Sequence, residues 1–255
     1  MVEIKTDADL DGMREAGRVV AEILRATGEA AAVGVALREL DEVAREVLRA
    51  AGATSPFLGY RPSFAPTPFP AAICTSVNDA IVHGVPDDYR LRDGDLLSID
   101  CGATLDGWTG DAAVTVTVGT PRPEDEVLLK TTRSALEAGI AAALAGSRMG
   151  DISHAIGSVG RGAGFGIPDG FGGHGIGRAM HEDPPVPNEG RRGRGFRLRH
   201  GLALAIEPML TAGGGDAFYT APDGWTLRTT DGSRAAHFEH SVAVTDEGPR
   251  ILTAP

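Results

Sequence analysis

Cysteine is scarce in this sequence, since the chain of 255 residues contains only Cys74 and Cys101. Two cysteines cannot form a disulfide framework, and neither has the second cysteine of a CxxC pair. Small disulfide-rich folds, zinc ribbons and redox-active CxxC sites are therefore excluded. We expect Cys74 to be a small pocket or core residue rather than a nucleophile.

Long apolar runs and an excess of positive charge are also missing. No stretch reaches the roughly 18 unbroken apolar residues of a membrane helix, and the first residues lack the layout of a signal peptide. The 24 Lys and Arg residues are outnumbered by 35 Asp and Glu residues, so the formal net charge is −11. Such a charge disfavours sequence-independent binding to nucleic acid or anionic lipid. We expect a cytoplasmic protein without DNA or a membrane as a partner.

The chain contains no convincing linker and no short tandem repeat, so we expect one domain over residues 1–255. Hydrophobic residues make up 42% and charged residues 23%, which is typical of a globular protein. Helical spacing of apolar residues predicts helices over 9–29 and 37–51, the second ending at Gly52. The proline-rich segment 55–72 cannot be a central strand or a helix interior, and we expect an ordered loop with exposed aromatic residues.

The apolar pattern then changes from helical to extended. Short runs of β-branched residues predict two strands joined through Asp106-Gly107, a strong hairpin signal. Helices and strands follow. The expected elements after residue 72 are strands 96–101 and 112–118, helices 121–144 and 151–159, and strands 202–206 and 238–244. Elements of one kind grouped in this way indicate an α+β fold rather than a strictly alternating parallel sheet.

Asp100 and Asp111 lie on opposite arms of the predicted hairpin. Either Asp100 or Gly102 can lie opposite Asp111, depending on the register, and both registers place the two carboxylates on the same face of the sheet. Two facing carboxylates repel each other unless a proton or a cation lies between them. Ionised together, they favour a metal site.

Three further residues are candidate metal ligands: His174 in a glycine-rich segment, Glu207 before Pro208, and Glu239. Four carboxylates and one imidazole suit Mn²⁺, Fe²⁺ or Co²⁺ better than a thiolate-rich zinc site would. This much negative charge suits two divalent ions that activate water. The predicted chemistry is hydrolysis.

Several short segments together resemble type I methionine aminopeptidases, in an order and spacing that run from Ile4 to Thr253. These segments are Asn-Asp-Ala-Ile-Val-His-Gly at 78–84, Ile-Asp-Cys-Gly at 99–102, Gly-Asp at 110–111, Gly-His-Gly-Ile-Gly at 173–177, Met-His-Glu at 180–182, Ile-Glu-Pro at 206–208 and Phe-Glu-His at 238–240. The resemblance implies the pita-bread fold, a single α+β domain with internal pseudo-symmetry. Each half of such a domain supplies ligands to a central cleft.

The resemblance also implies a role for each candidate ligand. Asp111 and Glu239 would bridge two divalent ions, drawn from Co, Mn, Fe, Ni or Zn. Asp100 would complete the shell of one ion, and His174 with Glu207 that of the other.

Catalytic roles follow from the same resemblance. Glu207 would also be the proton shuttle. His181 would contact the scissile peptide group, and His83 would lie near the leaving side.

The residues expected to bind the methionine side chain are Tyr60, Phe69, Cys74, Met180 and Trp225. Aromatic rings and sulfur are good partners for a thioether. The chain between Tyr60 and Phe69 is longer and richer in proline than is usual for the family, which leaves the alignment of Phe69 open.

The expected activity is removal of the initiator methionine from nascent proteins whose second residue is small and uncharged, by a monomer. Glu207 and Glu239 are 32 residues apart, which leaves no room for the insertion of the type II enzymes and points to the short bacterial-style form. The alternatives are a binding protein on the same fold whose site has decayed, and a related metallo-aminopeptidase of different specificity, such as one that cleaves before proline.

Some charged residues match no motif of the family. His154, His200 and His237 are expected to be structural or exposed. The arginine-rich stretch 191–199 is interpreted as a solvated loop, with a weak contact to ribosomal RNA as the alternative.

Overall fold

The structure, a computed structural model, describes residues 2–63 and 65–255. Its helices are α1 (Asp7–Ala30), α2 (Leu37–Ala51), α3 (Pro123–Ala142) and α4 (Met149–Gly162). Its strands are β1 (Ile73–Val77), β2 (Ala80–Val82), β3 (Asp95–Leu105), β4 (Trp108–Val118), β5 (Gly172–Gly175), β6 (Glu182–Pro187), β7 (Ala203–Ile206), β8 (Met209–Thr211), β9 (Phe218–Thr220), β10 (Leu227–Thr229), β11 (Ala235–His237), β12 (Glu239–Thr245) and β13 (Gly248–Ile251). None of the helices in these described residues combines the length and the apolar character needed to cross a membrane.

The four helices form where the apolar spacing predicts them, with ends that shift by a few residues. Thr6 and Asp9 start α1 with a capping box, in which each side chain accepts a hydrogen bond from the backbone of the other. This arrangement satisfies two of the N–H groups that a helix start leaves free. Helix α2 ends at Gly52, whose φ of 65° is left-handed, as helix C-termini commonly require.

The hairpin predicted around Asp106-Gly107 is present as β3 and β4. Both turn residues have positive φ, 49° and 78°, and such a turn follows the natural twist of paired strands. Gly102 pairs with Asp111, which is one of the two registers that the sequence allowed. Asp100 and Asp111 therefore lie on the same face of the sheet.

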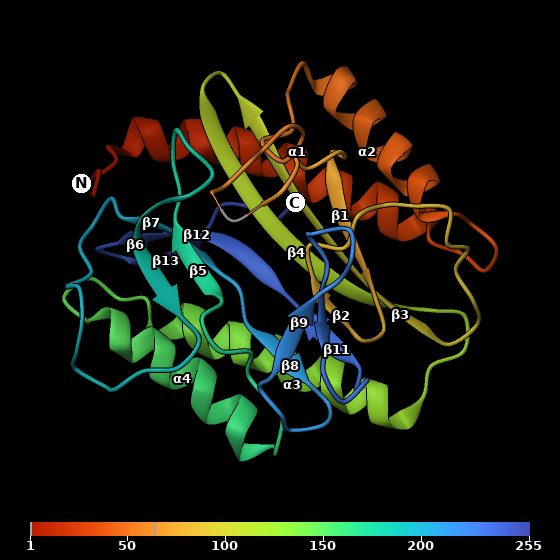
Figure 1. Cartoon of the computed structure of the whole chain (residues 1–255). Helices are drawn as coiled ribbons and strands as arrows, with labels where there is room; N and C mark the ends of the chain where they lie inside the picture. The colour runs from red at the N-terminus through yellow and green to blue at the C-terminus, as the bar shows by residue number, and fades with distance from the viewer. Residues whose placement is uncertain (1, 64) are drawn as a thin grey trace.

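One large antiparallel sheet organises the molecule, with strands in the order β1-β3-β4-β12-β7-β5-β6 and with β13 paired to β12. Strands from the first half of the chain lie at one end of this order and strands from the second half at the other. Helices α1 and α2 pack against β3 in one apolar core, while α3 and α4 pack against β7 and β12 in another. Figure 1 shows the two helix pairs at opposite edges of the molecule, with the sheet between them. The α+β prediction is confirmed.

The proline-rich segment 55–72 is a loop, as expected, but the prediction that its aromatic residues are exposed is wrong for Phe57 and Phe69; Phe64 lies outside the described residues. Phe57 and Phe69 are only 7% and 3% exposed, and both belong to a buried cluster that includes Trp225. The apolar partner of the loop lies more than 150 residues away in the sequence, where local pattern cannot detect it. The buried aromatic side chains of this loop line the inside of the molecule, whereas Pro66, Pro68 and Pro70 are exposed.

Candidate metal centre

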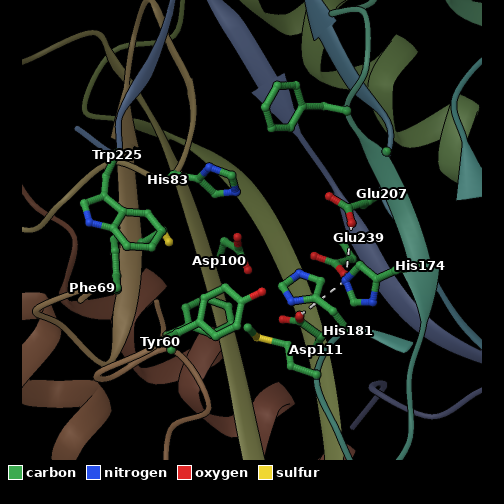
Figure 2. A pocket seen from close by; sticks show the side chains of 15 residues that line it. Tyr60, Phe69, His83, Asp100, Asp111, His174, His181, Glu207, Trp225 and Glu239 are labelled. Carbon is green, nitrogen blue, oxygen red and sulfur yellow. Dashed lines mark ion pairs between the residues drawn. The ribbon is translucent and has the colours of Figure 1, made fainter. Parts of the chain in front are cut away.

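One cavity of about 270 Å³ collects the side chains that the sequence singled out. The twelve predicted site residues that line it are Tyr60, Phe69, Cys74, His83, Asp100, Asp111, His174, Met180, His181, Glu207, Trp225 and Glu239. Figure 2 shows Trp225, Phe69 and Tyr60 on one side of this cavity and Glu207, Glu239, His174 and Asp111 on the other. The cavity therefore has an apolar wall facing a polar one.

Strand register brings three of the carboxylates together. Ala113 on β4 pairs with Asp100 on β3 and also with Glu239 on β12. Asp111 is two residues from Ala113 and so shares its face of the sheet. Glu207 follows β7, which pairs with β12 on its other side. Residues far apart in the sequence thus meet at the centre of the sheet.

His174 joins the carboxylates from β5, where two glycines allow close strand packing. A Cβ atom on Gly173 would lie 2.0 Å from the Ala205 carbonyl oxygen, and one on Gly175 would lie 2.2 Å from that of Asp183. The His174 Nδ1–H donates to the Gly175 carbonyl at 2.9 Å, because a carbonyl oxygen can only accept. The Nε2 lone pair then points inward, as a metal-ligating imidazole requires.

The distances around His174 suit ligands that share an ion. Its Nε2 lies 3.5 Å from Glu207 Oε1 and 4.0 Å from Asp111 Oδ2. Two ligands that are each about 2.1 Å from one ion are separated by roughly 3 to 4 Å. One ligand atom each from Asp111, His174 and Glu239 also lie within 4.8 Å of one another.

Burial of so many carboxylates without counter-charge raises their pKa values. Burial raises the pKa of Asp100 to about 7, and burial followed by the charge of Asp100 raises that of Glu207 to about 8. The pKa values of Asp111 and Glu239 are raised well above the usual range by burial and then by neighbouring carboxylates. One oxygen each of Asp100, Asp111 and Glu239 is buried without a hydrogen-bond partner in the described structure. This set of ligands fits divalent cations, which would neutralise the negative charge of the carboxylates and be coordinated by the unpartnered oxygens.

Two histidines lie between the polar and apolar walls. His83 follows β2 with a left-handed φ of 59°, a conformation that is uncommon outside glycine and often found at functional sites. Burial, and then the nearby His181, lower the pKa of His83 to about 4. The His181 ring is 4.3 Å from the His174 ring and 5.2 Å from the Tyr60 ring.

The apolar wall is built from rings that pack edge to face. The Phe69 ring lies 5.1 Å from that of Trp225 at 77°. The Trp225 indole N–H donates to the Thr67 carbonyl at 3.2 Å. These contacts hold the indole against the proline-rich loop. Cys74 is buried in the same wall, and burial raises the pKa of its thiol well above the ordinary value, so it is a poor nucleophile.

Sequence reasoning missed three residues of this region. Phe57 and Phe171 line the cavity, and no motif predicted them. His237, expected to be structural or exposed, is buried, and its Nε2 lies 3.6 Å from Glu207 Oε2 and 3.8 Å from Glu239 Oε2. His237 is the last residue of β11 and Glu239 the first of β12, so alternation along the predicted strand 238–244 gave no signal for His237.

Comparisons with known proteins relate nearly the whole chain to one group of enzymes. The sequence profile of a family described as metallopeptidase family M24 matches residues 11–246. Methionine aminopeptidase 1 of Mycobacterium tuberculosis is 53% identical over 99% of this chain and 95% of its own length. The crystal structure of a methionine aminopeptidase from Thermotoga maritima superimposes with a TM-score of 0.95 at 38% identity, covering 100% of both chains. A prolidase from Pyrococcus furiosus has a TM-score of 0.76 at 21% identity, over 99% of this chain but 65% of that chain, which is a likeness of fold alone.

Proposed function

We propose that this chain, which belongs to metallopeptidase family M24, removes the N-terminal methionine from peptides and newly made proteins. The proposal depends on one observation. A single cavity has an apolar wall suited to a thioether side chain on one side and a cluster of carboxylates and His174 suited to metal ions on the other. We place this activity in the cytoplasm, where nascent chains are made.

Two divalent ions, drawn from Co, Mn, Fe, Ni or Zn, would be held by the clustered side chains. Asp111 and Glu239 would bridge them, Asp100 would complete one shell, and His174 with Glu207 the other. The buried, unpartnered oxygens of Asp100, Asp111 and Glu239 support this assignment. When bound, such ions supply a water of lowered pKa and polarise a peptide carbonyl, which is the chemistry that amide hydrolysis needs.

The protein's own groups would manage the protons and orient the substrate. Glu207 would take a proton from the attacking water and pass it to the leaving amine. His181, which lies between the polar and apolar walls, would donate a hydrogen bond to the scissile peptide group. His83, held neutral by burial, would bind the leaving side without adding charge.

Specificity would come from the apolar wall. Tyr60, Phe69, Cys74, Met180 and Trp225 would surround the methionine side chain, because sulfur and aromatic rings make favourable contacts with a thioether. Tyr60 and His181, whose rings are in contact, would narrow the space beyond the cleaved bond. We therefore expect a preference for a small, uncharged second residue.

The test is release of free methionine from Met-Ala-Ser and Met-Lys-Ser by metal-stripped protein, before and after addition of Mn²⁺, Fe²⁺ or Co²⁺. We expect metal-dependent cleavage of Met-Ala-Ser alone. A peptide with proline in second place and a residue other than methionine first tests the prolidase-like alternative.

Two results would contradict the proposal. Two bound ions with no cleavage of any peptide would indicate a binding protein on this fold. Preferential cleavage before proline would move the specificity toward that of the prolidases.

A further inference from the structure

His237 contacts the carboxylate cluster although no role of the proposed site uses it. Its side chain is 1% exposed, and both ring nitrogens lack a hydrogen-bond partner in the described structure. Burying an imidazole without hydrogen-bond partners lowers the free energy of unfolding. The position is nevertheless fixed firmly, because the backbone N–H of His237 donates to the Thr115 hydroxyl and its carbonyl accepts from that hydroxyl, both at 2.8 Å.

The Glu207 carboxylate faces two imidazoles, one on each oxygen. His174 Nε2 is 3.5 Å from Oε1, and His237 Nε2 is 3.6 Å from Oε2. Within residues 2–63 and 65–255, no hydrogen bond to the Glu207 side chain is formed; Asn188 reaches only its backbone carbonyl. The orientation of this carboxylate therefore depends on whether each of the two facing ring nitrogens carries a proton or a lone pair.

The two imidazoles differ in which ring nitrogen can carry the proton. The ring proton of His174 lies on Nδ1, where it is donated to Gly175, so its Nε2 can only accept a proton or bind a cation. His237 has no acceptor at Nδ1. A proton on that nitrogen would be buried and unpartnered, and the Nε2 lone pair would then face a carboxylate oxygen. With its proton on Nε2, His237 has Glu207 Oε2 as an acceptor within reach.

We propose that His237 is a positioning residue that donates its Nε2–H to Glu207 Oε2 and so leaves Oε1 directed toward His174. This inference rests on the proposed function, because it explains how the two carboxylate oxygens of Glu207 are oriented for that reaction. The present separation is about half an ångström longer than a good hydrogen bond. Rotation of the Glu207 side chain can close it, as catalytic hydrogen bonds often tighten when a site is loaded.

Nitrogen NMR of protein labelled in its histidine rings tests the proton position directly. The His237 signals are assigned by their loss in His237→Gln. We expect a proton on His237 Nε2 after addition of Zn²⁺, used as a diamagnetic probe, while the His174 Nε2 signal shifts on metal binding. A His237 proton on Nδ1, or replacement of the Nε2 proton by Zn²⁺, would overturn the proposal.

The same experiment separates this inference from the proposed function. If Zn²⁺ binds and shifts His174 but the His237 proton is not on Nε2, only the role of His237 fails. If Zn²⁺ shifts neither histidine, the proposed metal centre itself fails. The proton positions are read on the wild-type protein, and His237→Gln is needed only to assign the His237 signals.

Kinetics of paired substitutions give a second readout. His237→Leu removes the donor, and loss of such a supporting contact to a ligand typically costs 10- to 100-fold, so we expect roughly that fall in kcat on Met-Ala-Ser with KM little changed. His237→Gln keeps an N–H donor and should recover most of the loss. His154→Leu, the same change at an exposed histidine of α4, is the control and should behave like wild type. Equal losses in the Leu and Gln variants would contradict the role of the N–H group.

Discussion

At the residue scale, the buried carboxylate cluster lowers the stability of the metal-free protein and at the same time suits metal binding. Asp111 and Glu239 are 3% and 2% exposed, and ionised groups at such depth are destabilising unless they are paired or bind cations. Neither is paired with Lys or Arg among the described residues. Substitutions here should therefore have opposite effects on the metal-free and the metal-bound protein.

Asp111→Asn tests this opposition. We expect Mn²⁺ affinity to fall about 100-fold or more, since a direct ligand should matter at least as much as the outer groups that support it. Methionine release should fall with it. The Tm of the metal-free variant should rise at pH 8, because a neutral amide replaces one of several repelling charges. Asp88→Asn, at a side chain 78% exposed, is the control, and a lower metal-free Tm in Asp111→Asn would contradict the argument.

Sequence reasoning succeeded for residues whose position follows from local geometry. Asp100 and Asp111 were placed on one face because alternation along a hairpin survives a register shift of two residues. His237 was missed because it lies outside the predicted strand 238–244 and no motif marked it. The roles of His83, His181 and the pocket residues stay predictions from the resemblance.

At the element scale, strand β5 can occupy its place only because its side chains are minimal. Gly173 and Gly175 let it approach β7 and the chain near Asp183. His174 is the one residue of the strand with a large side chain, and its direction depends on this packing.

Gly175→Ala should displace β5 and misplace His174. Its Cβ would lie 2.2 Å from a backbone oxygen, and such overpacking typically costs about 1–3 kcal/mol of folding free energy. We expect lower stability in urea and weaker Mn²⁺ binding together. Gly28→Ala is the control, because a Cβ there meets nothing within 4 Å in helix α1; it should stabilise the protein by up to about 1 kcal/mol. Unchanged metal binding in Gly175→Ala would show that β5 does not hold His174 in place.

A buried carboxylate of helix α2 anchors the end of the proline-rich loop. Asp41 accepts hydrogen bonds from the backbone N–H groups of Ala72 and Ile73 at 2.7 and 3.2 Å, and pairs with Arg45 at 2.6 Å. The loop end, and with it the wall containing Phe69, depends on this anchor.

Asp41→Ala should destabilise the protein by about 2–4 kcal/mol, since two buried N–H groups lose their acceptor. The KM for Met-Ala-Ser should rise because the apolar wall loosens. Asp41→Asn keeps an acceptor oxygen and should lose only about 1 kcal/mol, with KM near the wild-type value. Thermal melts and steady-state kinetics on the pair check both effects, and an equal KM in the two variants would contradict the link between anchor and wall.

Elements with strong periodicity were predictable, and elements defined by distant partners were not. The helices and the β3–β4 hairpin follow from local spacing and turn residues. Strands such as β5 and β8 to β11 have three or four residues each, too few for a period to be visible. The burial of Phe57 and Phe69 depends on Trp225, so only the tertiary structure reveals it.

At the scale of the whole molecule, side chains from both halves of the chain line one cavity, as expected for the pita-bread fold that the structural relatives support. Asp100 and Asp111 come from the first half, and His174, Glu207 and Glu239 from the second. Ions held between them would join the halves, so metal binding and global stability should be linked.

The pH dependence of metal-free stability follows from two sets of buried groups with opposite signs. Folding raises the pKa of Asp100 to about 7 and that of Glu207 to about 8, so the folded state binds more protons than the unfolded state and loses stability as pH rises toward 8. Folding lowers the pKa of His83 and His174 to about 4 and that of His237 to about 3. These histidines stabilise the fold increasingly as pH rises, but only up to their unfolded value of 6.5.

The two contributions therefore oppose each other below pH 6.5, and only the carboxylates act above it. We expect the Tm of the metal-stripped protein to fall between pH 6.5 and 8, and saturating Mn²⁺ to raise the Tm most at pH 8, where it displaces the fewest protons. Asp111→Asn should flatten the fall, because it removes part of the repulsion that raises the neighbouring pKa values. Calorimetry of both proteins across this range checks the prediction, and a metal-free Tm that rises from pH 6.5 to 8 would show that the carboxylates are not the dominant buried charges.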